Sequence, residues 1–139
     1  MLNWKAVVLG AIADFAGSIL AFHVLLLLWA YILNPGSAAD DAAFKAVEHS
    51  PLFLAVSFTV GWYFDYLGGR VAGLIAKRRG LQHGLSAAVP GVILAVVDVS
   101  SPSELSFPAW FVVVSCAISL ACACYGGARA VQGRETEAN

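Results

Sequence analysis

Apolar residues fill four long stretches of this chain, and most polar residues lie between them. The stretches cover residues 6–33, 51–76, 81–99 and 108–128. A helix rises 1.5 Å per residue, so about 20 residues cross a hydrocarbon core about 30 Å thick. The pattern therefore predicts an all-α fold, an integral membrane four-helix bundle that forms one domain over residues 1–131.

Composition agrees with a lipid environment. Of 139 residues, 60 % are hydrophobic and 12 % are charged, whereas soluble domains carry about 25 % charged residues. The net charge of −1 offers no basic surface, so we expect no nucleic acid partner. The first stretch is longer than the apolar core of a signal peptide, and we expect it to be retained. The expected partners are the lipid bilayer and either further copies of the chain or a larger membrane complex.

Basic residues gather on one side of the predicted bundle. That side has Lys5, the turn at residues 77–79, Arg129 and Arg134, while Lys45 stands among acidic residues on the other side. Short loops rich in Lys and Arg stay in the cytoplasm. We therefore expect both termini to be cytoplasmic and the protein to lie in the cytoplasmic (inner) membrane. The polar tail at residues 132–139 is predicted to be disordered.

The two halves of the sequence resemble each other. Residues 10–21 align with residues 84–95, and six of the twelve positions are identical. Glycine pairs at 68–69 and 126–127 end the second and fourth stretches. An even number of crossings separates the units, so a two-helix hairpin duplicated in parallel fits the pattern. A chance match between apolar sequences remains the alternative.

Small residues recur along one face of each stretch. Because lipid tails are as apolar as leucine, helices in membranes associate through close packing, which small residues permit. We expect the glycines to pack helices together rather than to bind phosphate. The predicted packing positions are Gly17, Gly61, Gly68, Gly69, Gly73, Gly91 and Gly126. Pro90 is expected to kink the third stretch.

Three charged residues lie deep within the stretches. Counted from the predicted cytoplasmic boundary, Arg70 is about 10 Å deep, Asp14 about 15 Å and Asp65 about 18 Å. Each costs about 2.5–3.5 kcal/mol unless it finds a partner. We expect Asp14 and Arg70 to form an ion pair, with Ser18 beside Asp14 and Tyr66 beside Arg70.

Asp65 does not fit that pair, because it lies about 140° around the helix from Arg70. It falls on the small-residue face, where we expect it to hold a proton or to meet another subunit. Two interpretations of these charges remain open. They either fix the register of the helices or form a proton or ion pathway.

Candidate cofactor ligands are sparse. His23 is the one histidine well inside an apolar stretch, so a single chain does not supply two axial ligands for a haem. Cys122 and Cys124 lie about 160° apart on a helix, and with Cys116 they are expected to be small packing residues. We predict no catalytic residue, no metal site and no cofactor.

One segment resembles a known pattern. Residues 68–84 read GGRVAGLIAKRRGLQHG, which is similar to the GGxxAGxxAxxxGxxHG run of small bacterial membrane proteins with four transmembrane helices. The resemblance covers about 17 residues and the four-span layout. It implies a bacterial origin and the same topology. It implies no activity, because those families are largely of unknown function, and Asp65 and Arg70 are not part of the pattern.

The expected function is that of a non-enzymatic subunit or assembly partner, which docks through its small-residue faces. The alternative is a small oligomeric transporter or channel, with Asp14, Asp65 and Arg70 lining a polar path. An intramembrane enzyme or haem carrier is the remaining alternative.

Overall fold

The computed structural model describes residues 1–33, 45, 47, 50–99 and 108–137, and these form an all-α structure. The prediction of an all-helical fold is confirmed. The predicted loops at 34–50 and 100–107 lie almost entirely outside the described residues. The helices are α1 (Trp4–Leu33), α3 (Pro51–Ala76), α4 (Gly80–Val99) and α5 (Ala109–Glu137).

Local chemistry explains where α3 begins and ends. The Ser50 hydroxyl accepts a hydrogen bond from the Phe53 N–H at 3.5 Å, and Pro51 occupies the first turn, where a missing N–H costs nothing. At the other end Lys77 adopts a left-handed conformation (φ 62°), and its N–H donates to the Gly73 carbonyl at 3.0 Å. The short turn that follows leads directly into α4.

One of the last two helices differs in detail from the sequence expectation. Helix α4 includes Pro90 and ends at Val99, in agreement with the predicted stretch at 81–99, and the kink at Pro90 stays a prediction. Helix α5 continues to Glu137, whereas the sequence predicts a disordered tail from residue 132. An existing helix extends easily, because each added residue contributes one more hydrogen bond.

Three helices in the described part of the chain are long and apolar enough to cross a membrane: α1, α4 over residues 80–97, and α5 over residues 109–133. The prediction of helices with the length and composition of membrane spans is confirmed for these three. Helix α3 has 26 residues but is not in this set, and it carries Asp65 and Arg70 in its second half.

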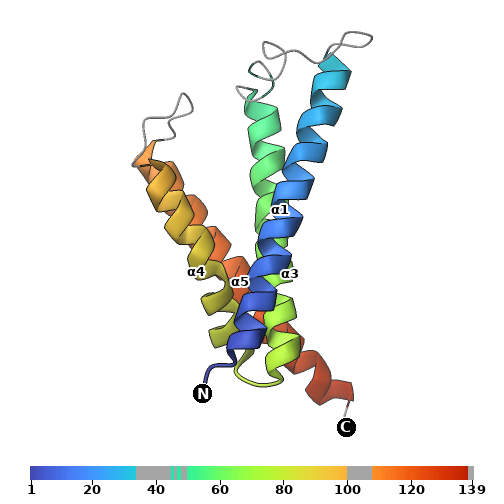
Figure 1. Cartoon of the computed structure of the whole chain (residues 1–139), viewed down its shortest axis with the longest axis vertical. Coiled ribbons are helices and arrows are strands. Elements are labelled where there is room, and N and C mark those ends of the chain that lie inside the picture. The colour runs from blue at the N-terminus through green and yellow to red at the C-terminus, as the bar shows by residue number, and fades with distance from the viewer. Residues whose placement is uncertain (34–44, 46, 48–49, 100–107, 138–139) are drawn as a thin grey trace.

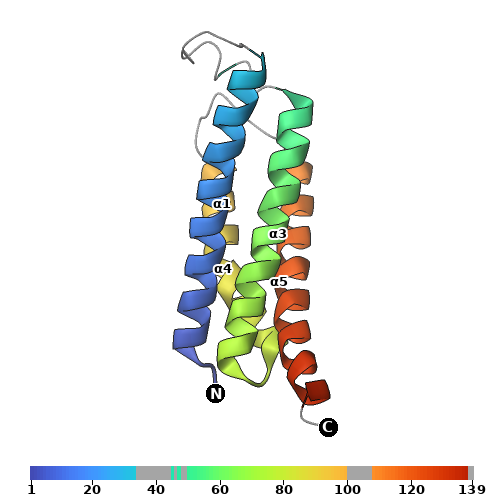
Figure 2. The same ribbon diagram turned by 90° about the vertical axis from the view of Figure 1, so that its right-hand side faces the viewer.

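The helices form two antiparallel hairpins, α1 with α3 and α4 with α5. Both termini and the α3–α4 turn lie at one end of the molecule, and the hairpins diverge towards the other end (Figure 1). Helix α3 packs against each of the other three helices, and in the side view it lies between α1 and α5 (Figure 2). We call the end with the termini the glycine-packed end and the other the splayed end.

Glycine residues allow the helices to approach closely at the glycine-packed end. A Cβ atom on Gly10 would lie 2.7 Å from the Gly68 carbonyl oxygen and 2.8 Å from the Cβ of Ala72. A Cβ on Gly69 would collide with the Ala123 backbone, and one on Gly80 would collide with Gly127. Backbone therefore rests on backbone across all four helices.

Aromatic side chains make the contacts towards the splayed end. The ring of Phe53 is buried and lies edge-on to Phe22 and Trp29, with ring centroids 5.7 Å and 6.1 Å away. Phe58 of α3 meets Phe111 of α5 at 4.9 Å. Long side chains thus bridge a gap that is too wide for backbone contact.

Candidate functional site

Asp14 is a buried acid in the middle of the bundle, with 7 % of its surface exposed. Helix α1 places it directly over Gly68, whose missing Cβ would lie 2.6 Å from the Asp14 Cβ. The Ser18 hydroxyl, one turn further along α1, donates to Asp14 Oδ1 at 3.4 Å. Gly68 on α3 therefore leaves the space that the Asp14 side chain needs. Ser18 lies beside the Asp14 carboxyl group, as the sequence predicts.

Asp65 of α3 completes the site. Its carboxyl group is within hydrogen-bonding reach of the Asp14 carboxyl group and of the Ser119 hydroxyl of α5. Three helices thus contribute to one polar cluster. We refer to Asp14 and Asp65 together as the carboxyl pair.

The contact between two acids limits the charge that the carboxyl pair can carry. A hydrogen bond between two carboxyl groups needs a proton on one of them, because a carboxylate has no donor. Two bare carboxylates at this separation would repel each other strongly, and more so away from water. The geometry therefore suits a pair that shares one proton.

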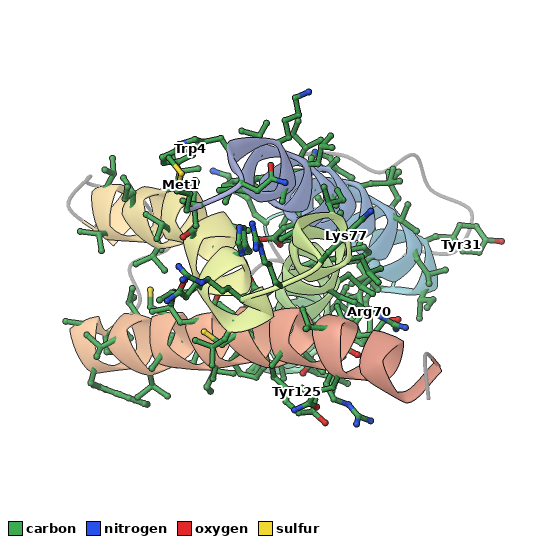
Figure 3. All side chains as sticks on the ribbon, turned by 90° about the horizontal axis from the view of Figure 1, so that it is seen from below. Met1, Trp4, Tyr31, Arg70, Lys77 and Tyr125 are labelled. Carbon is green, nitrogen blue, oxygen red and sulfur yellow. The ribbon has the colours of Figure 1, made fainter. Side chains whose placement is uncertain are left out.

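Arg70 is not the partner of Asp14. Its side chain is exposed on the outer side of α3 next to α5 (Figure 3), and its backbone nitrogen lies 3.0 Å from the Cβ position of Gly126. Arg70 is two residues beyond Gly68, about 200° around the helix, so it faces away when Gly68 faces Asp14. The predicted Asp14–Arg70 ion pair is not formed.

Tyr66 also lies away from the carboxyl pair. Its ring stacks on Tyr63 at 6.4 Å and lies 6.0 Å from Tyr125 of α5. Tyr66, which the sequence places beside Arg70, therefore belongs to an aromatic group on the α3–α5 surface.

The structure divides the predicted packing glycines into two groups. Gly17 lies under the ring of Phe64, and Gly126 lies against the Tyr66 carbonyl. Backbone contacts to neighbouring helices also form at Gly68, Gly69 and Gly73. Gly61 and Gly91 differ, because a Cβ on either would meet no atom within 4 Å. They face open space since the hairpins have diverged at their level.

The remaining candidate ligands do not assemble. His23 is exposed, and its Nδ1 lies 2.8 Å from the Ile19 carbonyl oxygen. Cys116, Cys122 and Cys124 are free thiols. Within the described ranges no group of three or more His, Cys, Asp or Glu residues could hold a metal ion.

One buried polar residue was missed by the sequence reasoning, which placed His83 among the basic charges of the turn. His83 is 1 % exposed. Its Nε2 accepts a hydrogen bond from the Asn3 N–H at 2.9 Å, and its Nδ1 lies 3.0 Å from the Arg79 carbonyl oxygen. The side chain therefore ties the start of α1 to the start of α4. The adjacent Gly84 was the sequence signal for burial at this position, since it allows the start of α4 to pack closely against α5.

No family model, curated protein or solved structure matches this chain. The chemistry of the carboxyl pair and its surroundings is therefore the basis for a function.

Proposed function

We propose that the chain is a small integral membrane carrier that binds and moves protons, with the carboxyl pair as its site. One observation supports this proposal above the others. Two carboxyl groups from separate helices, Asp14 of α1 and Asp65 of α3, meet in the interior of the bundle. Ionisable groups within transmembrane helices mark proton and ion pathways.

The proposal includes a membrane crossing by α3. Its 26 residues reach about 39 Å at 1.5 Å per residue, and it packs along α1 and α5, which are both apolar enough to cross. The two charged residues that lower the hydropathy of α3, Asp65 and Arg70, lie in different surroundings. Asp65 faces the protein, and Arg70 lies nearer the helix end, from where a long side chain can extend to the interface.

The proposed orientation puts the glycine-packed end in the cytoplasm. The turn residues Lys77, Arg78 and Arg79 lie at this end, as does Lys5 of α1. Basic residues next to spanning helices favour the cytoplasmic side. In the proposed orientation both termini are inside the cell and the splayed end is at the outer surface.

A purely structural role explains the carboxyl pair less well. A carboxyl group costs about 2.5–3.5 kcal/mol to place at the bilayer centre, and two serines could join α1 to α3 at a lower cost. A pair that shares one proton differs from such a clasp because it can take up a second proton or release the one it holds.

Transport requires that the pair exchanges protons with each side in turn. The two hairpins are joined by close contacts at one end and separate at the other. A rocking motion of one hairpin against the other would open the closed end, as in carriers built from two related halves. Asp14 belongs to one hairpin and Ser119 to the other, so this motion would change the surroundings of the pair.

The test is proton flux into liposomes that contain the purified protein and an internal pH-sensitive dye. We expect flux with the native chain and its loss with Asp14→Asn or Asp65→Asn, because an amide cannot carry the proton. Arg70→Gln is the matched control, since it removes an intramembrane charge outside the site and should leave flux unchanged. Flux that survives Asp65→Asn would contradict the proposal.

A second candidate function is that of a subunit in a larger membrane complex. The open faces at Gly61 and Gly91 would admit a helix from a partner or from another copy of the chain. Purification from native membranes in mild detergent should then yield a stoichiometric complex. A monomer that supports flux on its own would exclude this role as the main one.

A further inference from the structure

We infer that protons reach the carboxyl pair through water that enters from the splayed end, while the glycine-packed end is closed. This inference rests on the proposed function, because it names the route to the same site. In this route, water enters the space beside Gly61 from the splayed end and reaches Asp65, which lies one helical turn further along α3.

The closed end is sealed by backbone contacts. Below the carboxyl pair, Gly10 lies on Gly68, and Gly69 lies on Ala123. Further down, the added Cβ of Gly73 would lie 2.5 Å from the Gly127 carbonyl oxygen. Helices this close leave no space for a chain of water molecules between them.

The other direction is open. Gly61 precedes Asp65 by one turn and has no atom within 4 Å of its added Cβ, and the same holds for Gly91 of α4. Asp65 is only partly buried, in contrast to Asp14. Asp65 lies four residues beyond Gly61, about 40° around α3, so the proposed route places its exposed part towards the space beside Gly61.

Polar atoms accompany this space. Ser119 lies within hydrogen-bonding reach of Asp65, and Ser115 lies one turn nearer the splayed end on the same helix. On α3, Ser57 Oγ and Trp62 Nε1 are buried without a hydrogen-bond partner among the described residues. Ser57 lies one turn from Gly61 and Trp62 follows Gly61 directly, and since both atoms are covered, only movements that admit water would supply the missing partners.

Lipid tails or a partner helix could instead occupy the space, and each gives a different chemical environment. A lipid tail or an apolar helix leaves the Ser57 hydroxyl and the Trp62 indole N–H without partners, which is unfavourable in a dry setting. Water satisfies them and can relay a proton. The distribution of polar atoms therefore favours water.

The experiment measures labelling of Gly61→Cys by a charged, membrane-impermeant methanethiosulfonate, in a background with Cys116, Cys122 and Cys124 changed to Ala. The cysteine thiolate attacks the sulfenyl sulfur of the reagent, so that a mixed disulfide forms and methanesulfinate leaves, and this thiolate forms in water and not in lipid. The control is Tyr63→Cys, two residues away and about 200° around the helix, at a position that is 58 % exposed on the outer face. Trypsin cleavage at the Lys77–Arg79 turn reports the orientation of the vesicles.

We expect Gly61→Cys to react on the order of tenfold or more faster than Tyr63→Cys, and only when the reagent is on the side of the splayed end. Gly91→Cys should behave like Gly61→Cys and provides a second variant. Equal rates at Gly61→Cys and Tyr63→Cys, or reaction from the side of the glycine-packed end, would overturn the route.

Labelling and flux separate the two proposals. Labelling without flux would keep the water route and overturn the carrier. Flux without labelling would keep the carrier and overturn this route to its site.

Discussion

Gly69 is the position where one added methyl group should have the largest effect. Its Cβ would collide with the oxygen, carbon and Cα atoms of Ala123, and a helix backbone cannot turn aside as a flexible side chain can. Overpacking of this kind costs about 1–3 kcal/mol. Alanine also favours the helix over glycine by about 1 kcal/mol, which offsets part of the loss in Gly69→Ala.

Gly61→Ala isolates the steric contribution. It makes the same chemical change two turns away on α3, at a position with no atom within 4 Å, so it has the helix gain without the collision. Gly69→Ala should therefore be about 1–3 kcal/mol less stable than Gly61→Ala. The free energy of unfolding is measured by tryptophan fluorescence as sodium dodecyl sulfate is titrated into mild-detergent micelles. Equal stability of the two variants would refute the close α3–α5 packing.

Two further predictions concern the buried polar groups. Infrared spectra at neutral pH should show the C=O stretch of a protonated carboxyl group. This band should disappear in Asp65→Asn, because the asparagine amide can donate a hydrogen bond to an ionised Asp14. A band that persists in this variant would contradict the shared proton. His83→Phe keeps a ring of similar size but removes both hydrogen bonds, so it should lower the free energy of unfolding by about 1–3 kcal/mol and speed amide exchange at Asn3. Exchange at Asn3 that does not change would show that His83 does not hold the start of α1.

The sequence determines the helices well because their signal is long and one-dimensional. The predicted stretch at 51–76 coincides with α3, and the predicted starts of the other helices lie within two residues of those observed. The extension of α5 to Glu137 was missed because hydropathy marks where the apolar residues stop and not where hydrogen bonding stops.

The candidate site was harder to predict, because depth along a helix says nothing about rotation around it. Asp14 and Arg70 lie at compatible depths and have opposite charges, which made them the natural pair. The rotation of α3 follows from Gly68 and Gly69, where α1 and α5 approach its backbone closely, and this rotation turns Arg70 outwards. The position of Asp65 on the small-residue face was the correct clue, but attraction between opposite charges did not suggest a pair of acids.

The turn between α3 and α4 has a consequence for how the protein enters its membrane. Lys77 and Arg79 both have positive φ values, 62° and 53°, in a region that glycine enters freely and other residues enter at about 1–2 kcal/mol each. Glycine at both positions would relax the turn but remove two positive charges from it. In the proposed orientation these two charges favour a cytoplasmic position for the turn during insertion, and the strain of their backbone conformations reduces folding stability.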